Sequence, residues 1–295
     1  MVKKKSTGRT RKRKTSSRRK KSSSSIWKWI FSSSGQGRKE TPAWLHWFLL
    51  SLIIIAMMII FYRYFIHPYE YRWKPCTGCQ LYEICIPGKY EVHGIDISHY
   101  QNEIDWKQLR KSQYNKYPIR FIYIKATEGA SMCDAAFEQN FDSARVNGFI
   151  RGAYHYFNPE GDAAKQADFF ISKVNLQEGD LPPVLDVERK GSNSPDELRN
   201  KVKKWLFRIQ KHYGVKPILY TSYKFKTRYL TDSLLNTYPY WIAHYYVDSV
   251  QYKGQWTFWQ HTDVGKLPGI SERVDLNVYN GRLDEFMRMT IKKKK

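Results

Sequence analysis

The chain has 295 residues and a formal net charge of +23, which is enough length for one large domain and an appendage. The charge is uneven, because residues 1–40 hold about fifteen Lys and Arg against the single acid Glu40, and residues 292–295 are all lysine. The sequence between these tails is only mildly basic, so the charge describes the tails and not a site within the domain. The sequence also lacks the Gly-x-Ser-x-Gly, P-loop and Gly-x-Gly-x-x-Gly motifs, which leaves serine hydrolases and nucleotide-binding enzymes without support.

Residues 1–40 are rich in Lys, Arg, Ser and Gly and poor in apolar residues, so we expect a disordered tail. Such a tail can contact nucleic acid or anionic lipid, or it can act as a topology signal for an adjacent membrane segment. The segment that follows favours the topology signal, and we expect the tail to be cytoplasmic.

Residues 41–65 are predicted to form a transmembrane helix. Residues 44–62 carry no charge and would span about 28 Å as a helix, close to the thickness of the bilayer hydrocarbon. Trp44 and Trp47 at one end and Tyr62 and Tyr64 at the other match the aromatic belts of such helices. A buried helix would show a polar stripe, and a cleaved signal peptide would have a shorter apolar region, and this segment has neither feature. We therefore expect a single-pass type II protein of the cell (inner) membrane, with everything after the helix on the extracytoplasmic or periplasmic side.

Residues 66–91 are predicted to be a linker that contains cysteines. Cys76, Cys79 and Cys85 cluster there, and Cys133 is the fourth cysteine of the chain. The Cys76-x-x-Cys79 spacing is that of redox and zinc sites, but no second pair of ligands follows it. Outside the cytoplasm a local disulfide is the better interpretation, and its connectivity stays open. We predict no metal and no cofactor.

Residues 92–291 show a regular pattern that predicts a barrel, and residues 292–295 form a basic tail. The apolar runs of strand length cover residues 92–98, 121–127, 151–157, 183–188, 216–222, 240–245, 256–262 and 273–279. The first five are separated by amphipathic stretches long enough for crossover helices, one capped by Asp134 and ending at Gly148, another starting at Ser194-Pro195. The last three runs are too close for crossover helices. The pattern predicts an α/β fold: a modified TIM-type barrel with five β/α units and three further strands, partly antiparallel.

The run that ends in Asp186 and Glu188 is the centre of the predicted site. Strand side chains alternate, so Val184, Asp186 and Glu188 face the same side. Two carboxylates so placed repel, and an apolar wall raises the pKa of at least one of them. One acid then keeps its proton while the other is ionised, which is the division that glycosidases use. The alternative is a strand end with two solvated acids.

Polar and aromatic residues also occur at or near the ends of the other predicted strands, where barrel enzymes place their active sites. They are Asp96, Tyr154, Tyr156, Tyr220, Trp241, His244, Tyr245, Gln260 and Asp275. Together they predict a groove with several acids and an aromatic floor, suited to a sugar chain. His155, His244 and His261 are interpreted as hydrogen-bonded barrel residues that orient carboxylates, because no zinc spacing is present.

At these residues the chain resembles the glycoside hydrolase family 25 lysozymes, the Chalaropsis-type muramidases. The resemblance covers roughly residues 92–289. Its motifs are His93-Gly94-Ile95-Asp96-Ile97-Ser98, Ile124-Lys125-Ala126-Thr127-Glu128-Gly129, Gly152-Ala153-Tyr154-His155-Tyr156, Pro183-Val184-Leu185-Asp186-Val187-Glu188, Tyr220-Thr221-Ser222-Tyr223, Trp241-Ile242-Ala243-His244-Tyr245, Phe258-Trp259-Gln260-His261 and Val274-Asp275-Leu276-Asn277.

The resemblance implies an enzyme that cuts the β-1,4 bond between N-acetylmuramic acid and N-acetylglucosamine in peptidoglycan, with retention. It implies that Glu188 is the general acid/base and that Asp186 stabilises the oxocarbenium-like centre or orients the substrate's acetamido group. Asp96 and Asp275 would position the sugar. The expected partner is therefore a glycan strand of peptidoglycan.

Two other functions remain open at this point. A non-catalytic barrel could tether peptidoglycan to the membrane through its aromatic residues, although the intact set of acids argues against it. A nucleic-acid-binding role would use the basic tail, which could contact phosphates but contains nothing that reads bases.

Overall fold

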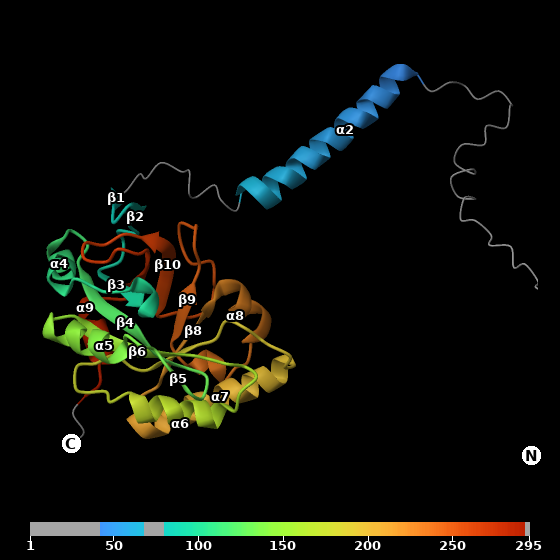
Figure 1. Cartoon of the computed structure of the whole chain (residues 1–295). Coiled ribbons are helices and arrows are strands. Elements are labelled where there is room, and N and C mark those ends of the chain that lie inside the picture. Colours follow the sequence, from blue (N-terminus) through green and yellow to red (C-terminus); the bar gives the residue numbers. More distant parts are fainter. Residues whose placement is uncertain (1–41, 68–79, 293–295) are drawn as a thin grey trace, which may run out of the picture. The chain divides into compact units, whose positions relative to one another are not determined.

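The computed structural model describes residues 42–67 and 80–292. The chain divides into two compact units, residues 1–59 and residues 60–295, and the second unit holds all the strands in the described ranges (Figure 1). The predicted basic tail 1–40, Cys76, Cys79 and residues 293–295 lie outside the described residues.

Helix α2, Ala43–Phe61, begins in the first unit, and a π-helical turn, Tyr62–Ile66, continues it. No residue of α2 is buried. Its one hydroxyl, on Ser51, donates to the carbonyl oxygen of Phe48 at 2.7 Å and so needs no partner outside the helix. Within the described ranges, Ala43–Ile66 is the one helix long and apolar enough to cross a membrane. Its 24 residues correspond to about 36 Å, which fits the predicted span by length and composition.

In the second unit, eight of the described strands close into a barrel, which confirms the predicted fold. In sheet order they are β3 (Val92–Ile97), β11 (Val274–Tyr279), β10 (Phe258–Gly265), β9 (Tyr240–Ala243), β8 (Ile218–Ser222), β7 (Val184–Asp186), β6 (Ile150–Tyr156) and β4 (Ile119–Glu128). Pairing of β3 with β4 closes the ring. A short strand, β5 (Met132–Cys133), adds to the end of β4 and was not predicted.

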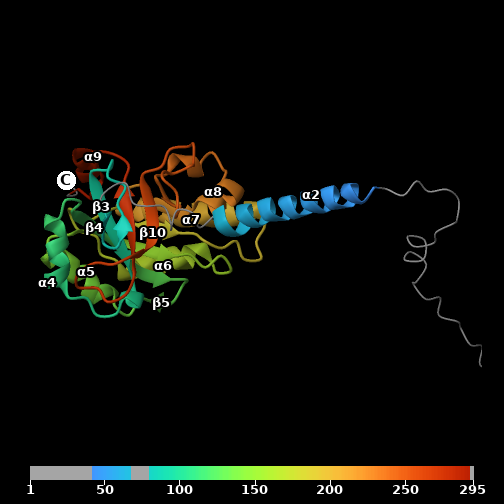
Figure 2. The ribbon, with the colours of Figure 1, turned by 90° about the horizontal axis from the view of Figure 1, so that it is seen from above.

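Helices surround the strands, as the view from above shows (Figure 2). They are α4 (Trp106–Leu109), α5 (Phe137–Val146), α6 (Ala163–Lys173), α7 (Pro195–Tyr213), α8 (Tyr223–Tyr229) and α9 (Leu283–Met289), with 3₁₀ turns at His99–Gln101, Arg110–Tyr114 and Leu235–Thr237. Helix α7 confirms its predicted start, because the Ser194 side chain accepts from the backbone N–H of Glu197 while Glu197 bonds back to Ser194. Helix α5 corrects the prediction for Asp134. That residue lies three positions before the helix and accepts from the backbone N–H of Ala136, and Ala136 is the N-cap.

The three strands without crossover helices differ in direction. Strand β10 runs parallel to β9 although residues 244–257 between them form no helix, whereas β11 runs antiparallel to both β10 and β3. This antiparallel step places Asp275 directly opposite Asp96. The predicted partly antiparallel end of the barrel is therefore confirmed, and it is β11 that reverses direction.

The barrel interior is filled by aromatic side chains below the site. Phe121 and Tyr123 of β4 point inward and contact the rings of Trp241 and Phe258 at centroid distances of 5.0–6.1 Å. Phe286 of α9 lies against Phe121 at 5.3 Å. Gly152 is required beside this stack, because a Cβ there would lie 2.2 Å from the Tyr123 ring. The aromatic packing forms the floor above which polar residues can gather.

A hairpin upstream of the barrel corrects the predicted linker 66–91. Strands β1 (Gln80–Leu81) and β2 (Ile84–Cys85) form it, and Tyr82 and Ile86 are buried in the outer core of the barrel. Tyr90 packs edge-on against Trp256 and Trp259 outside β10. The backbone N–H of Lys266 donates to the Tyr82 carbonyl at 2.9 Å. Residues 80–91 are thus part of the barrel unit, because their apolar side chains cover strands that have no helix outside them.

The cysteines of the described part are in two states. Cys85 is disulfide-bonded, in agreement with an extracytoplasmic location. Cys133 is free and exposed.

Candidate active site

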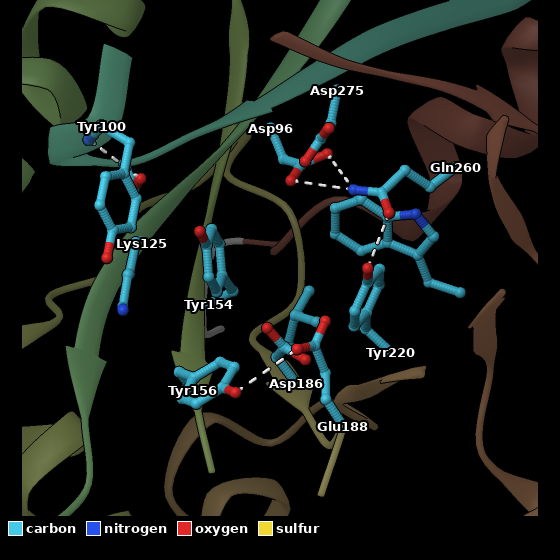
Figure 3. A pocket seen from close by; sticks show the side chains of 13 residues that line it. Asp96, Tyr100, Lys125, Tyr154, Tyr156, Asp186, Glu188, Tyr220, Gln260 and Asp275 are labelled. Carbon is cyan, nitrogen blue, oxygen red and sulfur yellow. Dashed lines mark hydrogen bonds between the residues drawn. The ribbon is translucent and has the colours of Figure 1, made fainter. Parts of the chain in front are cut away.

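A cleft opens at the carboxyl ends of the parallel strands. Its lining residues are Asp96, Ser98, Tyr100, Lys125, Tyr154, Tyr156, Val184, Asp186, Glu188, Tyr220, Trp241, Gln260 and Asp275 (Figure 3). All four acids selected from the sequence line it, as do five of the seven residues predicted to bind substrate. The two that do not are His244 and Tyr245.

Asp186 and Glu188 reach the same cleft by a shorter strand than predicted. Strand β7 ends at Asp186, so Glu188 lies two residues beyond it, yet the alternation continues and both carboxyls face the cleft (Figure 3). Asp186 is buried, with 8% of its surface exposed, and its Oδ1 has no hydrogen-bond partner in the described part of the chain. Glu188 is exposed at the mouth, where the Tyr156 hydroxyl donates to its Oε2 at 3.4 Å.

Both carboxyls of this pair bind protons more tightly than isolated acids. Burial raises the pKa of Asp186 well above its usual range, and the charges of Glu188 and Asp96 raise it further. Glu188 is exposed, but the cleft walls partly desolvate its carboxyl and raise its pKa, and the hydrogen bond from Tyr156 partly offsets that rise. The sequence argument placed the retained proton on one acid of the pair. In the structure desolvation raises the pKa of both acids, and more strongly that of Asp186.

Asp96 and Asp275 form a second pair of acids across β3 and β11. Asp96 accepts hydrogen bonds from the side-chain amides of Gln260, at 2.9 and 3.1 Å, and Asn277, at 2.7 Å. Burial raises the pKa of Asp96 to about 6, and these donors limit the rise. Burial, followed by the charge of Asp96, raises the pKa of Asp275 to about 9.

Gln260 connects the acids to the aromatic wall. Its Oε1 accepts from the hydroxyl of Tyr220 at 2.7 Å and from the hydroxyl of Tyr245, while its Nε2 donates to Asp96. Tyr245 therefore lies behind the cleft surface and positions Gln260. Trp241 donates its indole N–H to Asn277 Oδ1 at 2.9 Å, which orients the amide that binds Asp96. The network therefore holds the two side-chain amides that donate to Asp96, those of Gln260 and Asn277, in a single orientation each.

Lys125, Ser98 and Tyr100 line the cleft but were not selected from the sequence. Lys125 is the one cation among the lining residues, and its Nζ lies 2.6 Å from Glu128 Oε2 and 5.1 Å from the centre of the Tyr156 ring. Its inward direction follows from the alternation Phe121, Tyr123, Lys125 along β4, a signal that the sequence contained. Tyr100 lies in the 3₁₀ turn after β3, and nothing in the strand pattern distinguishes it.

The three histidines considered from sequence are not among the residues that line the cleft, and none of them hydrogen-bonds a carboxylate in the part of the chain that the structure describes. The two nitrogens of His155 contact Thr127 at 2.7 Å and Gln166 at 3.1 Å. The ring of His244 stacks on Tyr223, with 4.5 Å between centroids. His261 is buried against Trp259, and burial lowers its pKa to about 3. The described residues contain no group of three or more His, Cys, Asp or Glu side chains that could hold a metal ion.

The arrangement is that of a site for acid–base chemistry on a neutral polar substrate. Four carboxyls with raised pKa values stand opposite one lysine and a wall of tyrosines, with an opening to solvent. Tyrosine hydroxyls and ring faces suit the hydroxyl groups and C–H faces of sugars.

Comparison with known proteins agrees with this geometry. The model of glycosyl hydrolases family 25 matches residues 95–270. The chain is 43% identical to the uncharacterized protein YegX of Escherichia coli (strain K12) over 223 residues, which cover 75% of this chain and 80% of the relative. It is 31% identical to the N,O-diacetylmuramidase of Chalaropsis sp over 217 residues, covering 67% of this chain and 98% of the relative.

Its fold is also similar to the crystal structure of the bacterial lysozyme from Streptomyces coelicolor, with a TM-score of 0.62 and 31% identity. That match covers 68% of this chain and 96% of the lysozyme. The family match spans more than half of the chain and contains three of the four acids of the cleft, while the fourth, Asp275, follows it closely. The chain therefore belongs to glycosyl hydrolases family 25.

Proposed function

We propose that the protein is a membrane-anchored peptidoglycan hydrolase that cuts the β-1,4 bond between N-acetylmuramic acid and N-acetylglucosamine with retention. The observation that carries the proposal is the pair Asp186 and Glu188, one buried with a free oxygen and one at the mouth of the same cleft. The similarity to a lysozyme and to an N,O-diacetylmuramidase supports the choice of substrate.

Glu188 is proposed as the general acid/base. Partial desolvation by the cleft walls raises its pKa, so it carries a proton at a higher pH than an ordinary glutamate, and Tyr156 holds the carboxyl in a fixed direction. It would protonate the leaving oxygen and later remove a proton from the attacking water.

Asp186 is proposed to orient the substrate's acetamido group. An amide N–H that donates to the unpartnered Oδ1 would favour the ionised carboxylate and lower its raised pKa. Substrate binding would then leave the charge on Asp186 and the proton on Glu188. With its N–H held by the ionised Asp186, the acetamido group would attack the anomeric carbon through its oxygen while the glycosidic C–O bond breaks and Glu188 protonates the leaving oxygen. Water deprotonated by Glu188 would then open the resulting ring, with overall retention.

Asp96 and Asp275 are proposed to bind the sugar from the other end of the cleft, and Tyr154, Tyr156, Tyr220, Trp241 and Gln260 to form its walls. His244 and Tyr245 are proposed to support this wall from behind, through Tyr223 and Gln260. No metal or cofactor has a role in the proposed steps.

Helix α2 is proposed to anchor the enzyme in the cell (inner) membrane as a single-pass type II protein. Its length and composition support a membrane span, and the disulfide at Cys85 supports an extracytoplasmic barrel. Labelling of Lys107, an exposed side chain of the barrel, by a membrane-impermeant amine reagent in intact spheroplasts tests this orientation. Protection until the membrane is permeabilised would contradict it.

The proposed reaction is tested with the full chain in detergent micelles acting on purified sacculi. Mass spectrometry of the released fragments should find N-acetylmuramic acid at the reducing ends, and Glu188→Gln should abolish release. The matched control is Glu178→Gln, because Glu178 is exposed and outside the cleft lining. Reducing N-acetylglucosamine would identify a different bond, and binding of sacculi without any reducing ends would identify a tethering module instead of an enzyme.

A further inference from the structure

The turn after β3 presents an aromatic ring at the rim of the cleft. Tyr100 lines the cleft and 70% of its surface is exposed. In Figure 3 it stands apart from the four acids, on the other side of Tyr154. The proposed cleavage of one bond gives it no role, so its exposed ring face is available for another part of the substrate.

The buried carboxylate of Asp134 supports the Tyr100 ring from one side, through His99. The His99 ring lies against the Tyr100 ring with 4.1 Å between centroids and 36° between planes. Nδ1 of His99 lies 2.6 Å from Oδ2 of Asp134, and the backbone N–H of His99 donates to the same oxygen at 3.2 Å. Asp134 is buried and accepts through its other oxygen from the N–H of Ala136 at the head of α5. The imidazole is therefore fixed to the barrel.

The loop between β10 and β11 holds the turn from the other side. The Gln101 side chain accepts from the backbone N–H of Ser98 at 2.8 Å and donates to the carbonyl of Arg273 at 3.0 Å. Asn102 donates to Glu272 at 3.3 Å. The turn is thus tied to two different parts of the barrel, although the Tyr100 side chain itself is mostly exposed.

An exposed aromatic ring that is already ordered loses little conformational entropy when a ligand covers it. Its face is apolar and broad, and pyranose rings have apolar C–H faces of similar size. The ring lies in the lining of a cleft whose other end holds the acids. These are the properties of a stacking platform for one sugar of a chain.

We propose that Tyr100 forms a saccharide-stacking subsite for a sugar outside the two that flank the cleaved bond, and that His99 and Asp134 position its ring. The inference rests on the proposed function and adds to it that the enzyme selects long glycan chains. The subsite contributes to binding of extended glycan strands and nothing to the chemical step.

The first test compares glycan oligosaccharides of increasing length, from tetrasaccharide to decasaccharide, with the full chain in detergent micelles. Tyr100→Ala should lower kcat/KM on the longest chains by about tenfold through KM, and leave the tetrasaccharide within about twofold. Tyr100→Phe, which keeps the ring, should retain the length preference. The control is Tyr114→Ala, because Tyr114 is 76% exposed but outside the cleft lining. An equal loss at every length, or no loss at any length, would overturn the subsite.

The second test asks whether His99 acts by positioning the Tyr100 ring or contributes to sugar binding separately. His99→Ala should reproduce part of the length-dependent loss, and adding it to Tyr100→Ala should cause little further loss, because both act through one ring. Fully additive losses would show that His99 does not work through Tyr100. Thermal unfolding of each variant identifies any that fail to fold, and the His99→Gln variant then takes the place of His99→Ala.

The two proposals fail in different ways. Wild-type protein that releases no reducing ends from sacculi or from any oligosaccharide would refute the hydrolase. Wild-type protein that cuts all lengths with equal kcat/KM, and variants that follow it, would refute the subsite and leave the hydrolase intact.

Discussion

Asp96 and Asp275 face each other as register partners of β3 and β11, and the carboxyl group of each shifts the pKa of the other. Two carboxyls in contact inside a protein do not both ionise, so the pair holds a shared proton near neutral pH. The donors Gln260 and Asn277 favour the charge on Asp96, which leaves the proton on Asp275. Asp275 then acts as a donor and Asp96 as the acceptor in the cleft.

This shared proton predicts a pH dependence of stability. The pKa of Asp275 is raised from 3.8 to about 9, so its stabilising contribution is complete below pH 3.8 and declines until pH exceeds about 9. Asp275→Asn removes that proton, and its melting temperature should fall less than that of wild type between pH 5 and pH 9. Thermal unfolding at pH 5, 7 and 9 measures the slopes, with Glu178→Gln as the control that keeps the wild-type slope. Parallel slopes for Asp275→Asn and wild type would contradict the assignment.

Gln260→Glu should damage the site more than its small change in size suggests. The substitution replaces the amide donor to Asp96 with an acid, while the hydroxyls of Tyr220 and Tyr245 still have an acceptor. Loss of a hydrogen bond to a charged group, with added repulsion, should lower kcat/KM by roughly 10- to 100-fold. Steady-state release of reducing ends measures this, and Gln251→Glu in the exposed loop 244–257 is the control. Activity equal to that of wild type would show that the hydrogen bond from Gln260 to Asp96 does not support catalysis.

Tyr156→Phe should move the basic limb of the pH–rate profile to higher pH. The Tyr156 hydroxyl stabilises the ionised form of Glu188, so its removal raises the pKa of the proposed acid further. The profile of kcat/KM reports the ionisation of the free enzyme, and its alkaline midpoint should rise. Tyr114→Phe should leave the midpoint unchanged. A shift toward lower pH in Tyr156→Phe would refute Glu188 as the group that must be protonated.

The buried pair Arg151 and Asp180 is predicted to stabilise the barrel. Arg151 donates to both oxygens of Asp180, at 2.9 and 3.3 Å, and to the carbonyl of Phe141 at 2.8 Å. Asp180→Asn removes the buried counter-charge of the guanidinium and leaves it only the exposed carboxylate of Asp142, at 3.2 Å, so it should lower the free energy of unfolding by about 3 kcal/mol. Urea unfolding followed by tryptophan fluorescence measures this. Asp284→Asn, which breaks the exposed pair with Arg288, should change little, and a similar loss in both variants would contradict the role of burial.

The barrel was predictable because its strands differ from their surroundings in simple ways. Apolar runs and their spacing indicated all eight strands, and the short gaps after residue 240 indicated that the last strands lack crossover helices. The ends of the strands were less predictable. Strand β7 stops at Asp186 although the sequence pattern continues to Glu188, because β-pairing stops while the side chains still alternate. The parallel pairing of β9 and β10 through a loop without a helix has no sequence signal that we recognise.

The acids of the site were predictable, whereas their protonation was not. Asp186 and Glu188 stood out by their spacing, but the raised pKa of Asp186 also depends on the charges of Asp96 on β3 and Asp275 on β11, which are distant in sequence. His244 lies near a strand end in the sequence, yet its ring faces Tyr223 outside the cleft, because position in the sequence does not determine which face a side chain occupies after the strand ends. Tyr100 was missed because it lies on a turn.

The hairpin of residues 80–85 and the segment after it set a limit on how this enzyme can be shortened. A catalytic fragment cut to the family match, residues 95–270, or to the first barrel strand at Val92 would strip Tyr82, Ile86 and Tyr90 from the outer wall and expose Trp256 and Trp259 to water. Such truncated forms should aggregate when expressed. Any soluble version, whether engineered or released by a protease, must keep the chain from Gln80 onward.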